Sequence, residues 1–122
     1  MRRYKVTVTT AADGSATAYT PRVAGTVHQI EYVKGNFDDG VDFTITGEAT
    51  GVGLWSESNV NASTVRAPRQ PAHSQVGAGL LYAAGGTAVA DKIALASDRV
   101  KIVIAQGGNA KTGTFHIIVD ND

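Results

Sequence analysis

The chain has 122 residues, of which 43% are hydrophobic and 18% are charged. This length predicts one domain with one core, and the hydrophobic content excludes a disordered chain. The 11 basic and 11 acidic residues cancel, so no long-range field draws the protein to nucleic acid or anionic lipid, and neither is expected as a partner. No cysteine is present, which excludes disulfides and thiol chemistry.

The N-terminal residues predict a strand and no secretory signal. Residues 4–9 alternate between apolar and polar side chains directly after Met1-Arg2-Arg3, with no apolar run between. Asp13-Gly14 predicts a turn, and residues 15–20 predict a second strand that ends at Pro21. The first two strands are therefore expected before residue 21.

Two further strands are predicted in the first half. Residues 25–34 place His28, Ile30 and Tyr32 on one face, and turn residues follow. Residues 41–46 alternate most regularly, with apolar side chains at every second position. Their Thr and Phe content is typical of a half-buried strand.

The middle of the chain is interrupted by glycine and proline. A strand is possible through residues 60–66, but residues 66–75 contain two prolines and cannot pair continuously in a central strand. We predict an exposed excursion there. Residues 76–86 fit either a glycine-weakened strand or an irregular buried segment. The uncharged stretch of residues 76–90 is too short for a membrane-spanning helix, so no membrane partner is expected.

The last third predicts a short strand over residues 88–95, then a hairpin of residues 100–104 and 114–119 with a glycine-rich tip. Seven to nine short strands without intervening helices favour an all-β fold. We predict a single domain over residues 1–122, an antiparallel β-sandwich or jelly-roll-like barrel.

The sequence contains no recognisable enzyme motif. His28 and His116 lie in predicted strands and His73 lies beside the prolines, without the spacing of paired zinc ligands. The Gly107–Gly113 segment lacks a glycine directly before Lys111, and a strand follows it, so a hairpin tip is favoured over a phosphate loop. We predict no catalytic residue, no cofactor and no metal.

The acidic residues 38–42 have two interpretations. Their carboxylates are hard oxygen ligands of the kind that calcium prefers, but the complete spacing of a known calcium loop is missing. A solvated turn is the favoured interpretation.

One charge asymmetry points to a partner. No carboxylate occurs between Glu57 and Asp91, whereas Arg66, Arg69 and His73 fall within that interval. The basic loop is a candidate contact for an acidic patch on a partner or a neighbouring copy, because arginine is enriched at interfaces. A solvated loop that contacts nothing is the alternative. Arg2 and Arg3 form a second candidate contact.

Trp55 is the only tryptophan, and two roles are open for it. It is either a core anchor or an exposed platform for a sugar ring or a protein partner, and burial is favoured.

End to end, the chain resembles the short all-β head-decoration, or cement, proteins of tailed bacteriophages. The similarity is one of ordered pattern, carried by Tyr4-Lys5-Val6-Thr7-Val8, Gly25-Thr26-Val27-His28-Gln29-Ile30-Glu31-Tyr32, Asp42-Phe43-Thr44-Ile45-Thr46, Pro68-Arg69, Asp98-Arg99-Val100-Lys101-Ile102-Val103-Ile104-Ala105-Gln106-Gly107-Gly108 and Gly113-Thr114-Phe115-His116-Ile117-Ile118-Val119.

This resemblance implies a homotrimer on the outer capsid surface of the virion, made in the cytoplasm of the bacterial host. Such trimers bind the major capsid protein where its subunits meet and stabilise the head. The alternative is a carbohydrate-binding or adhesive β-sandwich displayed on a virion or cell surface, with Trp55 or Tyr82 stacking on sugar.

Overall fold

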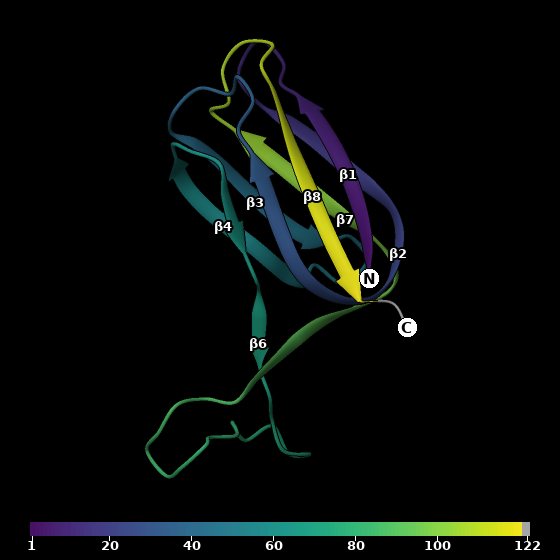
Figure 1. Cartoon of the computed structure of the whole chain (residues 1–122), viewed down its shortest axis with the longest axis vertical. Helices are drawn as coiled ribbons and strands as arrows, with labels where there is room; N and C mark the ends of the chain where they lie inside the picture. Colours follow the sequence, from purple (N-terminus) through teal and green to yellow (C-terminus); the bar gives the residue numbers. More distant parts are fainter. Residues whose placement is uncertain (121–122) are drawn as a thin grey trace.

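The computed structural model describes residues 1–120, and the elements in this range are β-strands (Figure 1). They are β1 (Arg2–Thr9), β2 (Ala16–Val33), β3 (Val41–Gly47), β4 (Gly53–Val60), β5 (Thr64–Arg66), β6 (Arg69–Pro71), β7 (Ala90–Ala105) and β8 (Thr112–Asp120). The antiparallel sheet has the order β1-β8-β2-β7-β3-β4, with β5 paired to β2 and β6 to β7. The predicted all-β, sandwich-like fold of seven to nine antiparallel strands is confirmed. Within residues 1–120 no helix is long and apolar enough to cross a membrane.

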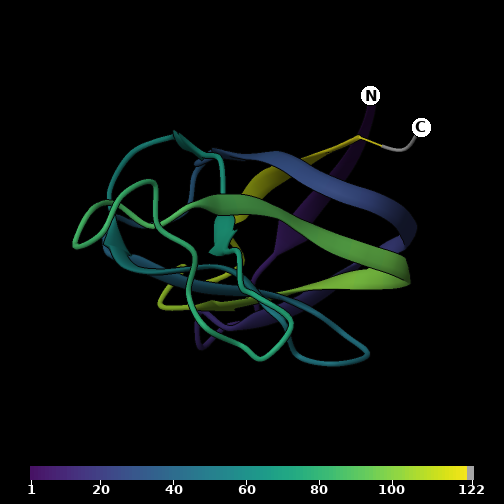
Figure 2. The same ribbon diagram turned by 90° about the horizontal axis from the view of Figure 1, so that it is seen from below.

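The long strand β2 belongs to both layers of the body. Its first half pairs with β7, and its second half pairs with β8 on one side and β5 on the other. Figure 2 shows β2 and β7 curving together round one side of the molecule. One continuous sheet thereby folds over onto itself and encloses the core.

The strand predicted to end at Pro21 continues through it. The β2–β7 register shifts between Tyr19 and Arg22, which leaves Pro21 exposed in an irregularity of the ladder. The Thr20 hydroxyl accepts the Val100 N–H at 2.9 Å and so provides an acceptor within this irregularity. A proline is tolerated at such a bulge because no ladder donor is required of it.

The predicted hairpin of residues 100–104 and 114–119 was wrong in its pairing, although both strands exist. β7 pairs with β2 and β3, whereas β8 pairs with β1 and β2. The connecting glycine-rich loop crosses between the layers and is held by the β1–β2 loop. Thr10 N–H donates to the Lys111 carbonyl at 2.9 Å, and Gly107 N–H donates to the Gly14 carbonyl at 2.9 Å.

An aromatic cluster joins the two layers at the centre of the body. Tyr32 of β2 lies 5.0 Å from Phe43 of β3 and 5.1 Å from Phe115 of β8, measured between ring centroids. Trp55 packs edge-on against Phe43 at 4.7 Å. Burial raises the pKa of Tyr32 to about 12, because the phenolate would lose its hydration. The predicted role of Trp55 as a core anchor is confirmed, since only 7% of it is exposed.

Residues 67–91, which we name the arm, leave the body as a narrow ribbon (Figure 1). Its first part is the pairing of β6 with the start of β7. No residue of the arm is buried, and every residue of the hydrophobic core lies outside it. The predicted exposed excursion over residues 66–75 is confirmed, whereas residues 76–86 are neither a regular strand nor a buried segment.

The two-part architecture predicts that valine truncation depends sharply on position. Val100 is fully buried and Val65 is 49% exposed. We expect Val100→Ala to lower the free energy of unfolding by about 2–3 kcal/mol, because it removes buried methyl groups and leaves a cavity. The chemically matched Val65→Ala should change it by less than about 0.5 kcal/mol. Urea denaturation measures both values, and equal losses would contradict the assigned core.

Candidate partner-binding surface

The distal half of the arm is organised by a ring of three backbone hydrogen bonds. Ala72 N–H donates to Val89, Val89 N–H to Leu80, and Leu80 N–H to Ala72, at 2.9 to 3.0 Å. Beyond this ring the chain forms two lobes, one closed by the bridge of His73 with Gly79 and the other by the bridge of Leu81 with Ala88. Both lobes are visible at the end of the arm in Figures 1 and 2.

Large apolar side chains of the arm are presented to solvent. Val76 is 91% exposed and Tyr82 75%, while Leu80 and Leu81 are 42% and 48% exposed. A small ribbon of this kind has marginal stability in water without a hydrophobic face to bury. Covering one such side chain contributes about 1.5–3 kcal/mol. The tip of the arm, residues 76–86, therefore has the composition of a contact surface.

Three side chains fasten the root of the arm to the body. The Trp55 indole donates to Glu57 Oε1 at 2.9 Å. Arg66 Nε and Nη2 donate to the two carboxylate oxygens of Glu57 at 3.2 and 3.1 Å, and its guanidinium carbon lies 5.5 Å from the Trp55 ring centroid. This bidentate pair with a cation–π contact fixes β5 against β4 where the chain leaves the body.

The predicted contact residues of the basic loop fall into two groups, one engaged at the root and one exposed on the arm. Arg66 belongs to the root and is engaged within the chain. Arg69 Nη1 donates to the carbonyls of His28 and Pro68 at 3.2 and 2.8 Å, and its side chain is exposed. His73 is exposed on the arm beside Gly79. Arg69 and His73 are thus the two predicted contact residues that the arm itself presents to solvent.

Arg2 and Arg3, the second predicted contact, lie on the body. Both are exposed on β1, and Arg3 Nη1 donates to Glu31 at 3.3 Å. The N-terminus lies at the end of the body from which the arm emerges (Figure 1). The fold therefore gathers both predicted basic elements at the same end of the molecule.

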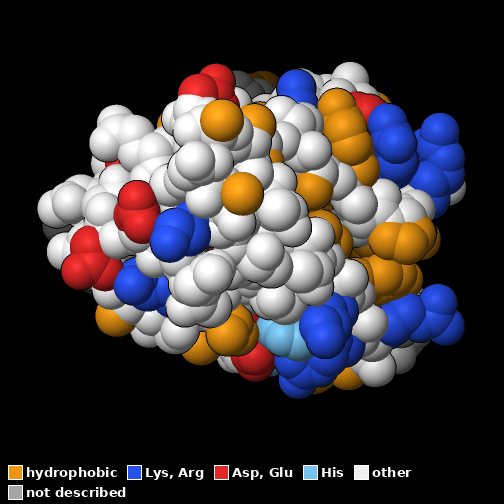
Figure 3. Space-filling view, turned by 90° about the horizontal axis from the view of Figure 1, so that it is seen from above, with side chains coloured by type: hydrophobic (Ala, Val, Ile, Leu, Met, Phe, Trp, Pro, Cys, Tyr) orange, Lys and Arg blue, Asp and Glu red, His pale blue; other side chains and the backbone are white. Residues whose placement is uncertain are grey.

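The opposite end of the body carries the acidic loop. Viewed from there, Lys and Arg gather toward one side of the surface, while acidic and basic side chains intermingle on the other (Figure 3). Asp39 pairs with Lys34 at 2.8 Å, and Asp42 accepts the Asn59 N–H at 2.8 Å. Asp39 and Asp42 therefore interact with different residues of the same chain. Within residues 1–120 no three His, Asp or Glu side chains converge in a group that would hold a metal ion.

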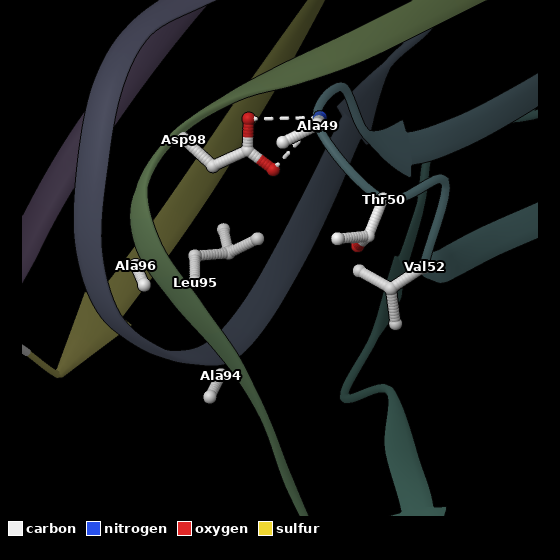
Figure 4. Close-up of a pocket in the computed structure, with 7 residues that line it drawn as sticks. All are labelled: Ala49, Thr50, Val52, Ala94, Leu95, Ala96 and Asp98. Atoms are coloured by element: carbon white, nitrogen blue, oxygen red, sulfur yellow. Dashed lines mark hydrogen bonds between the residues drawn. The ribbon is translucent and has the colours of Figure 1, made fainter.

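A shallow pocket of about 180 Å³ lies where β7 leaves the body toward the arm. Small and apolar side chains line it, among them Val52, Ala94, Leu95 and Ala96, and Asp98 closes one wall (Figure 4). Asp98 is 6% exposed, and both of its carboxylate oxygens accept the Ala49 N–H at 3.1 and 3.2 Å.

A second ion pair lies on the turn that follows β3, next to this pocket. Arg99 donates to Glu48 at 2.8 Å through Nε, and this hydrogen bond lowers the pKa of Glu48. This pair holds Arg99 of β7 against the turn after β3, as the Glu57 pair holds Arg66 of β5 against β4.

No protein-family model matches this sequence, and no curated protein matches it. The functional assignment therefore rests on the surface geometry and on the ordered sequence pattern.

The apolar tip was missed by sequence reasoning. Residues 76–86 carry no charge and several glycines, which is equally typical of a buried irregular segment. The one available signal was the pair of prolines before it, which forces the chain away from the central sheet. Sequence periodicity alone does not show whether such a segment turns back into the core.

The root contacts predict a local effect of Glu57→Gln. Glutamine keeps an acceptor for the Trp55 indole but loses the charge that pairs with Arg66. Exposed ion pairs contribute about 0.2–1 kcal/mol, so amide exchange in β5 should accelerate by up to about fivefold. Hydrogen exchange measured by NMR tests this prediction.

The matched control is Glu48→Gln, which removes the charge from the Glu48–Arg99 pair and should leave β5 exchange unchanged. If both variants accelerate amide exchange in β5 equally, the Glu57–Arg66 pair has no specific role in holding β5.

Proposed function

We propose that this chain is a capsid decoration protein of a tailed phage, which binds the outer surface of the head as a homotrimer and stabilises contacts between major capsid protein subunits. The resemblance of the ordered strand pattern supports the family. The single observation that carries the binding role is the arm, an ordered projection without a core of its own and with an apolar tip.

The division between body and arm suits a clamp between larger subunits. The body has a complete core in residues outside the arm, so it supplies a rigid base. The arm adds reach, exposed apolar side chains, the Arg69 cation and the His73 imidazole. Several arms on one oligomer would bind identical sites together, so modest affinity at each contact is sufficient.

The carbohydrate-binding alternative has less support. Trp55 is buried among Phe43 and the root residues, so its ring is not a free platform for sugar. Tyr82 is 75% exposed, but it belongs to a narrow tip and not to a concave surface of the kind that ligand sites favour. A glycan site would therefore have to be built around Tyr82 alone.

The proposal predicts that Arg69 and His73 of the arm contribute to binding of the head. The probe is expanded heads assembled from the major capsid protein of the phage that carries this chain. We expect Arg69→Ala combined with His73→Ala to weaken binding about tenfold, because each lost polar contact is worth about 0.5–1.5 kcal/mol. Binding is measured by cosedimentation, and added salt should weaken the wild-type protein more than the variant.

Lys111→Ala is the control, because Lys111 lies in the loop at the end of the body opposite the arm. Both proteins should sediment as trimers in the absence of heads. Undiminished occupancy of heads by the double variant would show that these two residues are not the contact, and a monomer at all concentrations would contradict the trimer.

A further inference from the structure

The arm tip and the pocket beside β7 are two unpartnered features of the same chain. The tip exposes Leu80, Leu81 and Tyr82, and the pocket is lined by small side chains that leave a hollow of about 180 Å³. A water molecule occupies about 30 Å³ of liquid, so the hollow has room for one branched aliphatic side chain. The two surfaces match in size and in apolar character.

The charges of the two features are complementary. The arm carries the Arg69 cation and contains no carboxylate before Asp91. The wall of the pocket carries Asp98, which forms no ion pair within residues 1–120.

The arm is directed away from the pocket of its own chain. Arg66, Glu57 and Trp55 fix its root, and the ribbon extends outward from the body (Figure 1). The pocket lies on β7 close to that root, at Ala94 and Ala96, and no residue of the arm lines it. A second copy of the chain supplies an arm for this pocket and a pocket for this arm.

We propose that the arm tip docks in a neighbouring copy of this chain, with Leu81 seated in the pocket between the β3–β4 turn and β7. Each copy then gives one arm and receives one arm through the lobe of Leu81, which leaves the lobe closed by His73 and Gly79, with Val76, to contact the head. Such head-to-tail contacts form a closed ring when the rotation between copies closes. The inference deepens the proposed function and rests on it only for the number of copies in the ring.

The absence of native cysteine permits a direct test by disulfide trapping. One preparation carries Leu81→Cys and a second carries Ala96→Cys, and the two are mixed, allowed to exchange copies and oxidised with oxidised glutathione. Both positions are exposed, so the substitutions leave the core intact, which urea denaturation verifies. We expect a mixed disulfide between the two preparations, detected by mass spectrometry.

The matched control pairs Leu81→Cys with Ala12→Cys, which is equally exposed but lies in the β1–β2 loop at the other end of the body. The proposal requires the Ala96 pair to form at least tenfold more mixed disulfide than the Ala12 pair. Equal yields, or no mixed disulfide with Ala96→Cys, would overturn it.

A substitution without cysteine gives a second readout. Leu81→Asp places a carboxylate against Asp98 and should shift the self-association midpoint in sedimentation by at least tenfold in concentration. An unchanged midpoint would overturn the proposal. A protein that forms the mixed disulfide but does not bind heads would support the arm exchange and contradict the decoration role. A protein that binds heads but forms no mixed disulfide would support the decoration role and contradict the arm exchange.

Discussion

The contact among Arg66, Glu57 and Trp55 connects the core of this protein to its projecting arm. Trp55 packs on the central aromatic cluster, and its indole orients the carboxylate that holds Arg66. Without that contact, β5 would be three residues paired to one edge of β2. The root of the arm is therefore held on its β5 side by a buried ring and one ion pair and on its other side by the continuous strand β7, and residues 67–91 add no core packing of their own.

Different parts of the chain account for the stability of the fold and for the proposed binding of a partner. The aromatic and aliphatic core accounts for the fold, and it is complete without the arm. The arm is ordered by backbone hydrogen bonds, of which the ring joining Ala72, Leu80 and Val89 is the centre. Because its apolar side chains face solvent, they are available to a partner surface at no cost to the core. Such a projection suits the proposed role of joining larger subunits.

Much of the fold was predictable because alternation reports the face of a strand directly. Phe43 and Ile45 on β3, and Phe115 and Ile117 on β8, are buried as their spacing indicated. Pairing was less predictable, because a loop such as that of Gly107 joins either hairpin strands or strands in different layers. The apolar tip escaped prediction for a related reason: Leu80, Leu81 and Tyr82 have the same composition whether they face a core or a partner. Arg66 was predicted as a partner contact, and its pairing with Glu57 within the chain was not foreseen, because it depends on a register that no local pattern specifies.

The most direct test of the account is to remove residues 72–89 of the arm, which carry its tip and His73, and keep the body. Residues 72–89 can be replaced by Asn-Gly, because Pro71 and Ala90 are already paired and a two-residue turn closes such a ribbon. The account predicts that this variant unfolds in urea at nearly the wild-type midpoint but no longer binds expanded heads in cosedimentation. Binding of heads at wild-type affinity by the armless body would contradict the central claim.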